Sequence, residues 1–122
     1  MSEVENEMRE IEVSIDEAKK TVEKGKILRR LMTNPDWVAL IEEDYLREEA
    51  VRLTHLLDHP NEHLQAKQHL IMADQRGISA LKRYLHTTLQ LADQAEDQII
   101  AFENELEDLR AEEYQPTDGG LQ

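Results

Sequence analysis

The chain has 122 residues, 34% of them charged, and a formal net charge of −13 at neutral pH. One Phe, one Trp and three Tyr leave few large side chains for a deep globular core, so apolar stripes on helices must supply the burial. The absence of cysteine excludes disulfides and thiolate metal sites, and the acidity disfavours direct binding to nucleic acid or to an anionic membrane surface.

The first predicted element is a helix over residues 3–32. Its apolar positions alternate between spacings of four and three residues, as in Val4, Met8, Ile11, Ile15, Ala18, Val22 and Gly25. We expect this helix to end before Pro35, because a proline ring disfavours helical geometry at the preceding Asn34. Asn34 is also a favourable N-cap for a second helix that begins with Pro35.

The second predicted helix runs to about residue 57 and carries more apolar residues than one narrow stripe needs. The stripe itself contains Trp37, Ile41, Leu46, Ala50, Leu53 and Leu57, and Tyr45 widens it. Exposed apolar side chains in a cluster are typical of an interface. We therefore predict an interface and self-association through residues of this helix, namely Trp37, Val38, Leu40, Val51 and Leu56.

A turn at residues 58–61 precedes the third predicted helix, over residues 62–113. Its apolar positions form a sustained heptad seam of Ile78, Leu81, Leu85, Thr88, Ala92, Ala95, Ile99, Phe102, Leu106 and Leu109. Residues 1–114 are expected to form one domain, and residues 115–122, with Pro116 and two glycines, a disordered tail.

Folding the chain at residues 58–61 matches the seams layer by layer. Ile41 then faces Ile78, Ile15 faces Leu106, and Ala18 faces Phe102. The sequence therefore predicts an all-α protein, a long antiparallel helical hairpin or coiled coil with three helices and one arm broken near Asn34-Pro35. Three alternatives stay open: the first helix pairs with another subunit, the third helix self-associates, or the helices form a compact three-helix bundle.

Both ends of the chain are acidic, and the hairpin would bring them together. Residues 3–12 would oppose residues 105–113, so we expect a loose acidic tip represented by Glu5, Glu7, Glu107 and Asp108. Such a tip suits a basic protein surface or divalent cations. Two other interpretations are a merely solubilising surface and a mimic of DNA phosphates that occupies a DNA-binding protein.

The histidines near the turn do not form a convincing metal site. His55, His59, His63 and His69 lie close in sequence, with Asp58 and Glu62 nearby, but the turn disturbs their spacing and no cysteine anchors them. No residue has a recognisable activating neighbour for catalysis. We expect no metal, no cofactor, no catalytic residues and no enzymatic activity.

Residues 15–113 resemble small acidic helical proteins of tailed phages. The segments that carry the resemblance are DEAKK at 16–20, LMTNPDW at 31–37, EEDYLREEAVRL at 42–53 and LKRYL at 81–85. It implies a gene context of virion and head assembly and transfers no functional residues. The expected function is that of a non-enzymatic interaction protein, a structural or scaffold-like assembly factor, in the host cytoplasm or the virion. The alternative function is an acidic inhibitor of a DNA-binding protein.

Overall fold

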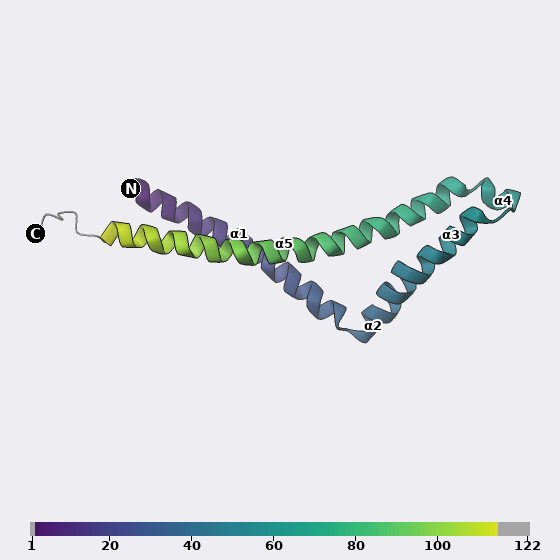
Figure 1. Cartoon of the computed structure of the whole chain (residues 1–122), viewed down its shortest axis with the longest axis horizontal. Coiled ribbons are helices and arrows are strands. Elements are labelled where there is room, and N and C mark those ends of the chain that lie inside the picture. Colours follow the sequence, from purple (N-terminus) through teal and green to yellow (C-terminus); the bar gives the residue numbers. More distant parts are fainter. Residues whose placement is uncertain (1, 115–122) are drawn as a thin grey trace, which may run out of the picture. The chain divides into compact units, whose positions relative to one another are not determined.

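The computed structural model describes residues 2–114, and these are helical except at short connections (Figure 1). The elements are α1 (Glu3–Met32), α2 (Pro35–Trp37), the π-helix η1 (Val38–Glu49), α3 (Ala50–Asp58), α4 (Glu62–Gln65) and α5 (Gln68–Tyr114). Residues 2–114 contain no strand, which confirms the all-α class. The tail expected at residues 115–122 lies outside the described residues.

Contacts divide the chain into two compact units. Unit 1 comprises residues 1–25 and 90–122, and unit 2 comprises residues 26–89. Each unit contains one pairing of helical segments from distant parts of the sequence. The single domain expected over residues 1–114 stays a prediction.

In unit 1, α1 packs antiparallel against the last part of α5 (Figure 1). Ile11 and Ile15 form a buried cluster with Leu106, against which Met8, Phe102 and Leu109 pack. A second buried cluster contains Ala18, Val22 and Ala95, with Ile99 beside it. Along this pairing the residue numbers rise in one helix as they fall in the other, so the predicted hairpin is confirmed within unit 1.

In unit 2, η1 and α3 pack antiparallel against the first part of α5. Leu46 and Leu53 form a buried cluster with Ile71 and Ile78, and Leu53 is only 1% exposed. The predicted layers of Ile41 with Ile78 and of Ala50 with Ile71 belong to this cluster. Two polar contacts support it, because Gln75 donates to Thr54 Oγ1 over 3.2 Å and Gln68 donates to the Leu57 carbonyl over 3.4 Å.

The break between α1 and α2 has the predicted chemistry. The Asn34 side chain accepts a hydrogen bond from the Asp36 backbone N–H over 2.8 Å, and Pro35 occupies the first helical position. At the end of α1, the Thr33 hydroxyl and backbone N–H both donate to the Arg30 carbonyl. These bonds satisfy backbone groups that a helix end leaves without partners.

The predicted second helix is present, but it is not α-helical throughout. The segment consists of α2, a twelve-residue π-helix and α3. The reason lies in the apolar stripe, where Leu46 follows Ile41 by five residues. In an α-helix five residues turn about 140° past one full turn, which would move Leu46 away from the core. Winding with i→i+5 hydrogen bonds returns Leu46 to the buried side.

The predicted third helix begins at residue 62 as expected, but a break near its start was not predicted. A turn at Ala66 and Lys67 interrupts the helix. Two hydrogen bonds there span three residues: the Lys67 N–H donates to the Leu64 carbonyl, and the Leu70 N–H donates to the Lys67 carbonyl. The break separates α4 from α5 and begins α5 at Gln68. From that position the Gln68 amide reaches the Leu57 carbonyl at the end of α3.

Candidate functional site

The residues of the predicted interface lie in three different environments. Leu56 packs against the buried cluster of unit 2, and Trp37 and Val38 are half-buried. Leu40 and Val51 are 63% and 51% exposed. Val51 lies on the side of α3 opposite the buried Leu53, because two residues span about 200° of an α-helix.

A different set of exposed apolar residues lies on η1 and α5 of unit 2. Leu40 and Tyr45 of η1 line one shallow groove, and Tyr45 lines a second groove together with Gly77 of α5. The Tyr45 hydroxyl lies 3.7 Å from the position that a Cβ on Gly77 would occupy. Tyr45 therefore lies over Gly77 and connects the exposed sides of η1 and α5.

The exposed side of α5 continues in both directions from Gly77. Leu70 and Tyr84 lie seven residues before and after it, and seven residues of an α-helix return to within about 20° of the same direction. Both side chains are exposed, at 53% and 58%. We call the surface formed by Leu40, Tyr45, Leu70, Gly77 and Tyr84 the Tyr45 face.

Paired charges lie at the margin of the Tyr45 face. The Arg52 guanidinium donates from Nε and Nη2 to the two carboxylate oxygens of Glu49, each over 2.6 Å. These hydrogen bonds lower the pKa of the Glu49 carboxyl and raise the pKa of the Arg52 guanidinium. The negative charge of Asp74 raises the pKa of Arg52 further. Glu49 and Asp74 both line the groove beside Gly77, so the charged residues that line this groove are acidic, and Arg52 adjoins it through its bonds to Glu49.

The Tyr45 face was not predicted as a unit. Tyr45 was recognised only as widening an apolar stripe, and Leu70 and Tyr84 were not singled out. The available signal was a second heptad row at positions 70, 77 and 84, directly beside the seam positions 71, 78 and 85.

The residues of the predicted acidic tip are all exposed in unit 1. Glu5 and Glu7 lie in the first turns of α1, and Glu107 and Asp108 lie near the end of α5. The helices pair as far as Met8 and Leu109, which pack against the buried cluster there. Only Glu107 of these four lines the groove between the helices.

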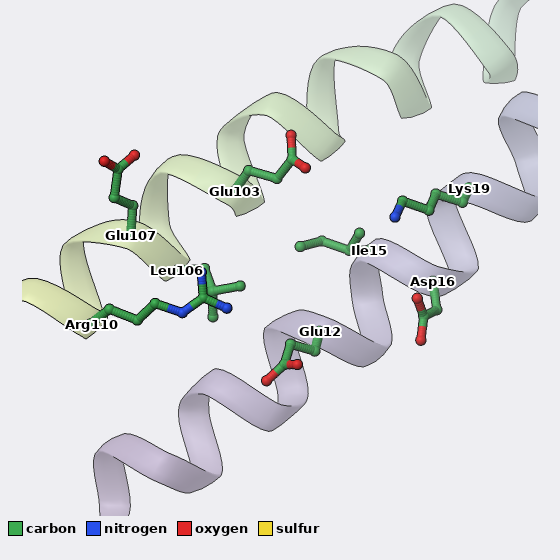
Figure 2. Close-up of a pocket in the computed structure, with 8 residues that line it drawn as sticks. All are labelled: Glu12, Ile15, Asp16, Lys19, Glu103, Leu106, Glu107 and Arg110. Atoms are coloured by element: carbon green, nitrogen blue, oxygen red, sulfur yellow. The ribbon is translucent and has the colours of Figure 1, made fainter. Parts of the chain in front are cut away.

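That groove has a volume of about 570 Å³ and mixed charge. Figure 2 shows Ile15 and Leu106 pointing into the space between α1 and α5, with Lys19 and Arg110 reaching into the same space. Its exposed carboxylates are Glu12, Asp16, Glu103 and Glu107. Acid–base catalysis by a carboxylate pair needs two contrasting environments, and these four share one exposed environment.

In the histidine-rich turn, side-chain hydrogen bonds hold the backbone and cap the next helix. His59 Nδ1 accepts a hydrogen bond from the Asn61 N–H over 3.2 Å, and the Asn61 side chain accepts one from the His63 N–H over 2.8 Å. Asn61 is thereby the N-cap of α4. Within residues 2–114, no three His, Asp or Glu side chains are grouped so that they could hold a metal ion.

Comparisons with known proteins add no assignment. No family model, curated protein or solved structure matches this chain. Among the described helices, none is both long and apolar enough to cross a membrane.

Proposed function

We propose that this chain is a non-enzymatic helical interaction protein, a structural or scaffold-like assembly factor of the kind that its resemblance to tailed-phage proteins implies. Its place of action would be the host cytoplasm or the virion. The observation that carries the proposal is the uneven distribution of apolar side chains between the two units. Of the large apolar residues exposed in the described part of the chain, eight lie in unit 2 and three in unit 1.

Charge is divided between the units in the opposite way. Unit 2 has nine acidic and nine basic residues, whereas unit 1 has eighteen acidic and five basic residues and carries the entire net charge of −13. Protein interfaces are depleted of charge at their centre and enriched in tyrosine. The exposed Leu and Tyr side chains of unit 2 therefore form the surface expected for protein binding, and the acidic surface of unit 1 is expected to remain solvated or to meet a basic partner.

Affinity capture from native host cells with matched variants tests this function. We expect Leu70→Gln/Tyr84→Gln to lose partners that the wild-type chain retains. Val13→Gln/Ile100→Gln is the control, because Val13 and Ile100 have similar exposure (56% and 59%) and lie in unit 1. Equal capture by all three chains would overturn the assignment of partner binding to unit 2.

The second candidate function is an acidic inhibitor that mimics nucleic acid, and the concentration of all net charge in unit 1 favours it. This function predicts that captured partners are DNA-binding proteins and that added duplex DNA releases them. Neutralising Glu5, Glu7, Glu107 and Asp108 together would then abolish capture. Partners that withstand both DNA and this variant would contradict the inhibitor function.

A further inference from the structure

The Tyr45 face contains a glycine that the fold of unit 2 does not require. Gly77 lies within α5 and has a negative φ, so its backbone conformation is open to residues with a side chain. A Cβ at this position would meet only the Tyr45 hydroxyl, at an ordinary van der Waals distance of 3.7 Å. Glycine is also less favourable than alanine inside a helix. Neither the backbone nor the packing of the described residues therefore explains Gly77.

The missing side chain leaves room for a close contact in the middle of an exposed apolar surface. Leu70 and Tyr84 are 53% and 58% exposed, and Gly77, midway between them in sequence, is exposed as well. The distance between two packed helices depends on the side chains at their contact, and a glycine allows the closest approach. A further helix packed along positions 70, 77 and 84 would thus bring its backbone close to α5 at Gly77.

The charged residues that line the two grooves of the Tyr45 face are all acidic. They are Asp44, Glu49 and Asp74, and no Lys, Arg or His lines either groove. Arg52 already bonds to both carboxylate oxygens of Glu49. In the part of the chain that the structure describes, Asp44 and Asp74 take part in no hydrogen bond or ion pair. A helix with Lys or Arg beside its apolar stripe would supply the opposite charge, whereas an acidic helix would be repelled.

We propose that the Tyr45 face binds a basic amphipathic helix of another protein. The apolar stripe of the partner helix covers Leu70, Gly77 and Tyr84. Its cationic side chains pair with Asp44 and Asp74. The proposal rests on the proposed function, because it states the chemistry of the partner for the same surface. Unit 1 would attract the same cations, but its described part exposes only three large apolar residues against eight in unit 2.

Fluorescence anisotropy with two designed peptides and the full chain tests the charge of the partner. Each peptide has three heptads with leucine at positions a and d, and its e and g positions carry lysine in one peptide and glutamate in the other. We expect the lysine peptide to bind at least about tenfold more tightly than the glutamate peptide. Asp44→Asn/Asp74→Asn should weaken binding of the lysine peptide by at least about threefold. The control Glu5→Gln/Glu7→Gln removes the same charge from unit 1 and should weaken it by less.

A substitution at Gly77 tests the close contact. Gly77→Gln should weaken binding of the lysine peptide by at least about tenfold, because a long side chain would hold the two helices apart. Its free chain should keep or raise the thermal unfolding midpoint, since glutamine is the better helix former and the Cβ has room. Ser79→Gln is the matched control, because Ser79 is exposed on α5 and points about 200° away from Gly77.

Four results would overturn the proposal. They are a lysine peptide that does not bind, a glutamate peptide that binds as tightly, equal weakening by the aspartate variant and its unit 1 control, and unchanged binding to Gly77→Gln. Affinity capture separates this failure from failure of the proposed function. Partners that are lost by Leu70→Gln/Tyr84→Gln but retained by Asp44→Asn/Asp74→Asn and Gly77→Gln would reject the basic helix and leave the proposed function standing.

Discussion

Trp37 combines a half-buried ring with a polar atom that has no partner. Its indole Nε1 is inaccessible to solvent and has no hydrogen-bond acceptor among the described residues. A buried donor without an acceptor costs stability, because it has lost its water and gained nothing in return. The sequence predicted that Trp37 belongs to an apolar stripe. The environment of its ring nitrogen depends on tertiary packing, which the spacing of residues along the chain does not predict.

We expect Trp37→Phe to leave the free energy of unfolding unchanged or to raise it by about 1 kcal/mol, because it removes the unsatisfied N–H and keeps an aromatic ring. Trp37→Ala is the comparison, since it also removes the packing of the ring and should be destabilising. Urea denaturation followed by circular dichroism measures both. If Trp37→Phe lowered the free energy of unfolding as much as Trp37→Ala, the result would contradict an unsatisfied indole N–H.

Leu106 and Phe102 belong to the same cluster in unit 1 but differ in burial. Leu106 is 6% exposed, whereas Phe102 is half-buried. Leu106→Ala should therefore lower the free energy of unfolding by about 2–5 kcal/mol, and Phe102→Ala by less than the roughly 3–5 kcal/mol typical of a fully buried phenylalanine. Urea denaturation also tests this pair, with the exposed Glu105→Ala as a control near zero. A cost for Phe102→Ala at the top of that range would contradict the observed packing.

At the scale of elements, the sequence predicted the regular parts of the fold and missed the irregular ones. The four–three spacing of apolar residues predicted both ends of α1. Asn34 and Asn61 were recognised at the starts of two helices, and both are N-caps in the structure. The π-helix was missed because Ile41 and Leu46 were placed on one α-helical stripe without regard to the five-residue gap between them. The break at Ala66 and Lys67 was missed because neither residue is a helix breaker.

If the extra residue between Ile41 and Leu46 causes the π-helix, deleting one exposed residue there should convert η1 to α-helix. Deletion of Glu43 restores a four-residue gap, so Leu46 would stay buried with normal i→i+4 bonds. We expect the thermal unfolding midpoint to be unchanged or raised. Deletion of the exposed Glu10 in α1 is the control, since it rotates one side of the seam by about 100° and should lower the midpoint. An equal decrease of the thermal unfolding midpoint for both deletions would show that η1 does not depend on the five-residue gap.

At the scale of the whole molecule, net charge and exposed apolar surface lie in different units. The sequence predicted acidic ends and excess apolar residues, but the boundary between the units at residues 25–26 and 89–90 coincides with no break in α1 or α5. It emerges from long-range contacts, which periodicity along one helix does not contain. For the same reason the Tyr45 face, which needs η1 and α5 together, could not be assembled from the sequence.

The charge of unit 1 should make its stability depend on salt. The Debye length falls from about 30 Å at 0.01 M to about 10 Å at 0.1 M ionic strength, so added salt screens repulsion between exposed carboxylates. Hydrogen exchange should therefore slow in residues 3–12 and 105–113 as salt is added, and change little around residues 58–61. Neutralising Glu5, Glu7, Glu107 and Asp108 should reproduce the effect at low salt. Exchange rates that respond to neither change would identify the acids as a solubilising surface only.

The central claim is that this chain meets its partner through the Tyr45 face, and hydroxyl-radical footprinting tests it most directly. Tyr45 and Tyr84 lie on the face, whereas the exposed Met72 lies on another side of α5 and Ile100 lies in unit 1. Comparing the chain bound to the lysine peptide with the free chain, we predict that Tyr45 and Tyr84 lose reactivity while Met72 and Ile100 keep theirs. Protection of Ile100 with unchanged reactivity at Tyr45 and Tyr84 would contradict the claim.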